Sequence, residues 1–229
     1  KSAHKILGYD RYKDFLKGAK TERSAVSLLA AAAEKRGFVD LLAVESLEQG
    51  QGFYLNHRNK SFFMGILGEG LEKGIRLLAS HIDAPRLDLK GQPLYEEEGL
   101  ALFKTHYYGG IKKYQWVTVP LTLEGVVYRK DGTAINLSIG DKEGDPVFTI
   151  TDLLPHLASD QMSKTASKVV DGEMLNVLVG SIPKAGDGED AEAKAPSVKK
   201  GILSLLNREY GLLEEDFLRA ELEIVPQFS

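Results

Sequence analysis

The feature that most constrains the fold is an apolar run at residues 77–79, which leads through Ser80 into His81, Asp83 and Pro85 at alternate positions. A short apolar run bounded by polar residues is typical of a buried strand. Open α/β sheets place their chemistry at the carboxyl ends of such strands. We therefore expect a strand over residues 74–80 that presents His81 and Asp83 at the edge of a sheet.

Two further patterns in the first third of the chain fit an α/β layer. Residues 21–36 are rich in Ala and Leu, start with polar residues and precede Gly37, which predicts a capped helix. Residues 52–67 contain two strand-like runs around the polar turn HRNK, which predicts a hairpin.

From about Leu100 the sequence becomes rich in strand-like runs, with Asp131-Gly132 as a hairpin turn. Farther on, we expect a helix from near Asp152, a strand over residues 174–183, an exposed loop over 184–200, a helix over 201–211 and a strand over 219–226. This change of pattern predicts a second, β-rich module.

Composition narrows the kinds of partner and metal site. The net charge of −4 over 229 residues argues against a nucleic-acid or anionic-membrane partner, although a local basic patch would escape this argument. No apolar stretch approaches the ~18 residues that span a bilayer, and the polar start lacks a secretory apolar region. Without cysteine, any metal must be held by His, Asp or Glu, and a cytoplasmic location fits best.

The His-x-Asp pair at His81 and Asp83 suits a metal site. An imidazole can bind a metal through one nitrogen while a nearby carboxylate orients the ring or assists a neighbouring base. The pair is short and occurs by chance, so a hydrogen-bonded histidine at a strand end is the alternative.

Longer phrases around this pair carry a resemblance. SHIDAPRLDLK, KTHYYGGIKKYQWVTVPLTLEGVV, ITDLLPHLASDQM and GEMLNVLVGSIP occur in this order. Together they resemble the aspartyl aminopeptidase family of zinc metallopeptidases, in particular its bacterial members, over about residues 77–226.

The resemblance implies an α/β fold in which a catalytic sheet domain is interrupted by an inserted β-rich dimerisation domain. On this mapping residues 1–91 are the first half of the catalytic domain, 92–219 are the inserted domain, and 220–229 return toward the catalytic domain. It also implies peptide substrates, two zinc ions per intact active site with manganese or cobalt as alternatives, and a homo-oligomer, either a dimer or a dodecamer.

Residue by residue, the resemblance gives His81 as a zinc ligand and Asp83 as the aspartate that orients a catalytic group. His156, in the phrase DLLPHLASDQ, matches a histidine described as a metal ligand. Because His156 lies in the inserted module, whether it binds metal within its own subunit, across a subunit interface or not at all stays open. An acidic substrate preference would need a cationic side chain, for which Lys112 and Lys113 are candidates and surface lysines the alternative.

This sequence also departs from the family. The second catalytic half, which carries a bridging aspartate, a Glu-Glu pair and further ligands, does not follow Ser229. Two imidazoles cannot hold a pair of catalytic ions, and the general base is missing. We therefore expect a fragment that is inactive alone. The alternatives are a non-catalytic assembly subunit and a related di-zinc peptidase of different specificity.

The other conspicuous residues have ordinary explanations. His4 lies near a terminus and His57 in a polar turn, so we expect both to be ordinary surface residues. His106 lies in a strand-like run and is expected to be a strand residue of the inserted domain, with a substrate or interface contact as the alternative. The acidic run Glu96–Glu98 is expected to be a solvated segment.

Overall fold

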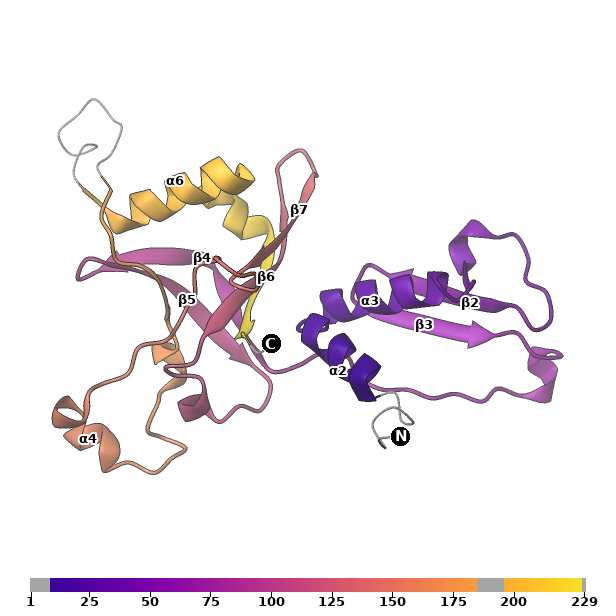
Figure 1. The fold of residues 1–229 in the computed structure, drawn as a ribbon, viewed down its shortest axis with the longest axis horizontal. Helices are drawn as coiled ribbons and strands as arrows, with labels where there is room; N and C mark the ends of the chain where they lie inside the picture. The colour runs from indigo at the N-terminus through magenta and orange to yellow at the C-terminus, as the bar shows by residue number, and fades with distance from the viewer. Residues whose placement is uncertain (1–8, 185–195, 228–229) are drawn as a thin grey trace. The chain divides into compact units, whose positions relative to one another are not determined.

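The computed structural model describes residues 9–184 and 196–227 (Figure 1). The chain divides after Ala84 into two compact units. The family resemblance implies a domain boundary after residue 91. We describe each unit by itself.

The first unit begins with two helices, α2 (Tyr9–Gly18) and α3 (Glu22–Glu34). Thr21 caps α3: its side chain accepts a hydrogen bond from the Ser24 backbone N–H, and the Ser24 side chain accepts one from the Thr21 backbone N–H. This reciprocal capping satisfies N–H groups that have no partner within the helix. The helix predicted over residues 21–36 is confirmed.

The first unit also contains a three-stranded sheet in the order β1 (Val39–Asp40), β2 (Gly52–His57) and β3 (Ser61–Ile66). β2 and β3 pair antiparallel, so the predicted hairpin is confirmed. Three residues, 58–60, connect the paired His57 and Ser61, and two of them, Arg58 and Asn59, have positive φ values of 58° and 56°. Helix α3 lies beside β2 and β3 (Figure 1).

The strand predicted over residues 74–80 is wrong for this structure. After a short 3₁₀ turn at Leu71–Lys73, residues 74–85 adopt no regular structure. Leu77 is 70% exposed and Leu78 is 99% exposed. A strand needs a neighbour to satisfy its backbone groups, and no described strand pairs with this segment.

The second unit is built on a six-stranded sheet in the order β7-β6-β9-β4-β5-β8. Its strands, all antiparallel to their neighbours, are β4 (Arg86–Glu97), β5 (Leu100–Tyr108), β6 (Leu121–Tyr128), β7 (Ala134–Ile139), β8 (Val177–Gly180) and β9 (Ala220–Pro226). Gly132, with φ 86°, lies in the turn between β6 and β7, as the Asp-Gly pair predicts. β8 and β9 confirm the strands predicted over residues 174–183 and 219–226.

Helix α6 (Val198–Tyr210) lies along one face of this sheet and confirms the helix predicted over residues 201–211 (Figure 1). The buried core on this face includes Leu87, Phe103, Leu123 and Ile224. Of the loop predicted over residues 184–200, residues 185–195 lie outside the described part of the chain.

The helix predicted from near Asp152 is largely wrong. The segment forms a 3₁₀ turn at Pro155–Leu157 and the short helix α4 (Ser159–Met162). Pro155 explains the difference, because proline has no N–H to donate and disfavours helical geometry in the residue before it. Leu154 is accordingly extended, with ψ 151°.

The mixed α/β fold class predicted from the sequence is confirmed. Within the described residues, no helix combines the length and apolar character needed to cross a membrane.

Candidate metal site

His81 and Asp83 lie close together in the extended segment of the first unit. His81 Nδ1 is 3.0 Å from the backbone carbonyl oxygen of Asp83 and 3.2 Å from its carboxylate Oδ1. Because a carbonyl oxygen can only accept, this hydrogen bond requires a proton on Nδ1. In the neutral ring, Nε2 is then the nitrogen with a free lone pair.

This arrangement fits a metal ligand. Histidines that bind metals commonly donate their other ring N–H to a carbonyl or carboxylate, which fixes the tautomer and the orientation of the ring. The His81 side chain is 84% exposed and that of Asp83 is 40% exposed, so a cation can approach the ring.

The described residues do not form a complete zinc site around His81. A catalytic zinc takes about three protein ligands and a water. Among the residues that the structure describes, His81 belongs to no group of three His, Asp or Glu side chains close enough to share one ion. Within the described residues, His81 could therefore supply at most one ligand of a zinc site.

His156 lies in the second unit, in the 3₁₀ turn at Pro155–Leu157, and is exposed. Its surroundings are also exposed and apolar: Leu153, Leu154, Leu157 and Met162 each have more than half of their surface accessible. Like His81, His156 joins no group of three ligand-type side chains within the described ranges.

A row of polar side chains crosses the six-stranded sheet on the face opposite the core, and the sequence interpretation missed it. Cross-strand pairing places these five residues in one row: Ser138, Glu124, Glu223, Asp88 and His106. The signal was present in the sequence as the alternation of apolar and charged residues in RLDLK and ELEIV.

Arg86 balances the carboxylates in this row. Its Nε lies 2.7 Å from Asp88 Oδ1 and 3.4 Å from Glu223 Oε1, and its guanidinium lies 4.1 Å from the centre of the Tyr108 ring. Like charges on adjacent strands repel, so a guanidinium between them stabilises the sheet.

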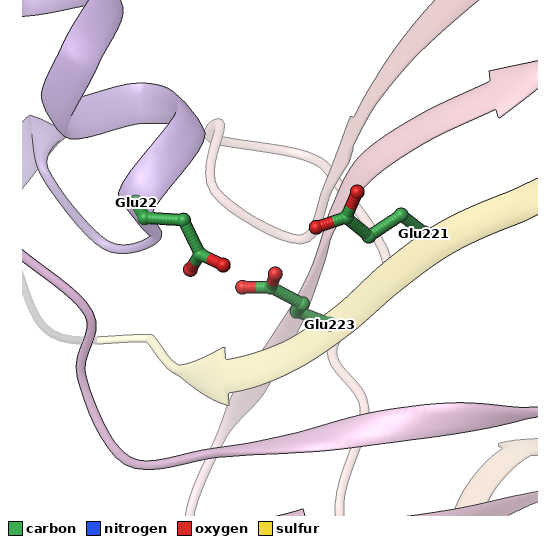
Figure 2. A group of neighbouring side chains, drawn as sticks. All are labelled: Glu22, Glu221 and Glu223. Atoms are coloured by element: carbon green, nitrogen blue, oxygen red, sulfur yellow. The ribbon is translucent and has the colours of Figure 1, made fainter. Parts of the chain in front are cut away.

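Figure 2 shows Glu221 and Glu223 projecting from β9. Glu22, drawn in the same figure, belongs to the first unit, where its carboxylate lies 2.5 Å from Lys60 Nζ.

The remaining candidates have structural roles. Lys113 Nζ lies 5.7 Å from the centre of the Tyr107 ring, a cation-π contact, and His106 stacks on Tyr107. Glu96 is exposed, as expected, yet its carboxylate also accepts hydrogen bonds from Ser197 Oγ and the Lys199 N–H at the start of α6. These bonds lower the pKa of Glu96.

Comparison with known proteins gives a consistent result. The family model described as aminopeptidase I zinc metalloprotease (M18) matches residues 15–228. The chain is 51% identical over 222 residues to a probable M18 family aminopeptidase 1 from Clostridium acetobutylicum, covering 95% of this chain and 47% of that protein. It spans about half the length of the curated relatives that it matches.

Solved structures agree in fold. A crystal structure of an M18 family aminopeptidase from Thermotoga maritima matches with a TM-score of 0.90 and 43% sequence identity, over 100% of this chain and 49% of that one. The S. cerevisiae mApe1 dodecamer matches with a TM-score of 0.64 over 96% of this chain and 48% of that one. At 21% identity this second match supports the fold alone.

Proposed function

Because this chain belongs to the aminopeptidase I zinc metalloprotease (M18) family, we propose that the complete polypeptide removes N-terminal residues from peptides. By complete polypeptide we mean the chain extended to the length of its relatives. The observation that carries the proposal is the geometry of His81, whose Nδ1 contacts Asp83 and whose Nε2 is available to a metal.

In this proposal His81 holds zinc through Nε2. Asp83 keeps the ring oriented through its backbone carbonyl and lies close enough for its carboxylate to support the imidazole electrostatically. When bound, zinc would lower the pKa of a water molecule to about 7 and polarise the scissile carbonyl. A second metal ion, with manganese or cobalt as alternatives to zinc, belongs to the same proposal.

The remaining parts of the active site are proposed to lie outside the 229 residues. One imidazole is too few for a catalytic zinc, so the other ligands and the general base would come from the second half of the complete polypeptide. His156 is a further candidate ligand, either within its own subunit or in a neighbouring one. The chain alone is then inactive.

A homo-oligomer is part of the proposal. The exposed apolar side chains around His156 suit a surface covered by a second subunit. The mApe1 dodecamer provides a precedent for assembly on a related fold. The absence of cysteine supports a reducing location such as the cytoplasm.

A preference for acidic N-terminal residues is proposed to depend on a cationic side chain. Lys112 and Lys113 lie just after a bend at Gly109-Gly110 that follows β5, and the Lys113 ammonium group already contacts the Tyr107 ring. Lys112 is therefore the better candidate of the two.

The alternative is an assembly subunit without catalytic activity. The exposed apolar segment around His156 supports this alternative as well, since it needs only an interface. The two proposals differ in whether His81 contributes to hydrolysis.

Peptidase assays test the proposal. We expect the complete polypeptide to hydrolyse substrates with N-terminal Asp, Glu or Leu, to lose activity with a chelator and to recover it when zinc, manganese or cobalt is added. His81→Ala should lower kcat/KM by at least about a hundredfold, as expected when a metal site is disabled. His57→Ala is the control and should retain activity. Hydrolysis of none of these substrates with any of the three metals would exclude the peptidase and favour the assembly subunit.

A further inference from the structure

The second unit contains a cavity of about 170 Å³ between α6 and the core face of the six-stranded sheet. Most of its lining is apolar and includes Phe103, Leu123, Val179 and Leu205. A cavity of ~150 Å³ with apolar walls is large enough to bind benzene. The volume therefore suits one aromatic ring or a branched alkyl group.

Polar groups line the same cavity. Asp145 follows β7, and Glu209 and Tyr210 belong to the last turn of α6. Asp145 Oδ2 accepts hydrogen bonds from the backbone N–H groups of Lys142, at 3.1 Å, and Gly140, at 3.0 Å. These bonds fix the carboxylate in place and lower its pKa, so Asp145 is ionised at neutral pH.

The charges at this cavity are mainly negative. Asp145, Glu209 and Tyr210 line the same cavity. Burial raises the pKa of Tyr210, and the Asp145 and Glu209 carboxylates raise it further. Glu209 pairs with Arg208 at 2.8 Å. The charge of Lys142 helps to lower the pKa of Asp145, yet within the described ranges no cationic group lies at ion-pair distance from the Asp145 carboxylate. A protonated amine would supply a closer positive charge.

We propose that this cavity binds a small hydrophobic amine, with its aryl or branched alkyl group among the apolar side chains and its ammonium group beside Asp145 and Glu209. The two carboxylates disfavour an anionic ligand of the same shape. A free amino acid is disfavoured as well, because its own carboxylate would lie next to Asp145. This proposal does not depend on the proposed role of His81.

Three probes of one shape and different charge test the proposal: benzylamine, benzyl alcohol and benzoate. Binding of each probe to the complete polypeptide at pH 7 is measured by ligand-observed NMR titration. We expect benzylamine to bind with a Kd on the order of 1 mM, as befits a ligand of this size. Benzyl alcohol should bind about tenfold more weakly, the difference expected for a charge-assisted hydrogen bond. Equal affinities for the three probes, or no binding of benzylamine, would overturn the proposal.

Two kinds of variant locate the site. Leu205 lines the cavity and is 39% exposed, so a larger side chain at this position can be accommodated. Leu205→Trp should fill the cavity and abolish binding of benzylamine and benzyl alcohol alike.

Asp145→Asn keeps an acceptor for the backbone N–H groups of Gly140 and Lys142 but removes the negative charge, so benzylamine should bind no better than benzyl alcohol. Glu209→Gln also removes a negative charge, at a residue that does not accept the hydrogen bonds of the Gly140–Asp145 turn. This variant replaces Asp145→Asn in the test if Asp145→Asn does not fold. Thermal unfolding checks the fold of each variant. Benzylamine binding that survives Leu205→Trp, or a preference for benzylamine that survives the charge variants, would place the amine elsewhere and refute the assignment.

Discussion

Glu96 lies in β4, and its carboxylate accepts hydrogen bonds from Ser197 Oγ at 2.6 Å and from the Lys199 N–H at 2.9 Å. The first backbone N–H groups of a helix have no partner within it, and the start of a helix favours negative charge. Glu96 therefore links the sheet to the start of α6. Arg129 acts at the other end of the helix, where it donates hydrogen bonds to the carbonyls of Tyr210 and Gly211.

Replacing Glu96 with Gln should make the stability of the protein less dependent on pH. The hydrogen bond from Ser197 and that from Lys199 lower the pKa of Glu96 in the folded state below its ordinary value of 4.5. A lowered folded pKa stabilises the protein above the unfolded pKa, and this stability is lost as pH falls through the folded pKa. The urea midpoint of Glu96→Gln should therefore be lower than that of the wild type at pH 7 and should approach it in acid. Glu97→Gln is the control. An equal loss at every pH from 3 to 7 would contradict a charge-dependent role for Glu96.

Elements whose stability is local could be predicted from the sequence. The α3 helix has its own capping residue in Thr21, and the β2-β3 hairpin joins strands adjacent in sequence through the polar turn HRNK. The predictions failed for two segments. In one, a proline prevents the predicted helix; in the other, the predicted strand has no neighbouring strand to pair with among the described residues. Pro155 keeps Leu154 extended, so the helix expected from near Asp152 does not form there. Residues 74–80 have the apolar composition of a strand but no described strand beside them.

We expect residues 74–80 to become a paired strand in the complete polypeptide, where the second half would provide its neighbours. Leu78→Glu should change the stability of the 229-residue chain by no more than about 0.5 kcal/mol, because this side chain is exposed there. In the complete polypeptide the same change should cost about 2 kcal/mol or more, because a charge would then be buried. Urea unfolding of both lengths measures the difference. Leu42→Glu serves as the control, since Leu42 is also largely exposed. A Leu78→Glu effect of the same size in both lengths would show that the segment stays uncovered.

At the scale of the whole molecule, only part of the candidate site could be predicted. The His81-x-Asp83 spacing brings the two residues together through the local backbone, and the structure shows that contact. The polar row across β7, β6, β9, β4 and β5 follows from strand alternation but needs the strand order, which short-range patterns do not contain. Short-range spacing predicted only this pair, and the described residues bring no third ligand-type side chain close enough to share an ion with His81.

His81 is proposed to bind a catalytic metal, and the zinc content of the complete polypeptide tests this role most directly. Metal analysis after dialysis against zinc-free buffer should find about two zinc ions per chain in the wild type, as a two-metal hydrolase requires. His81→Ala should lose most of this zinc, whereas His57→Ala, which changes an exposed histidine in the same unit, should keep it. Zinc content in His81→Ala equal to that of the wild type would contradict the account.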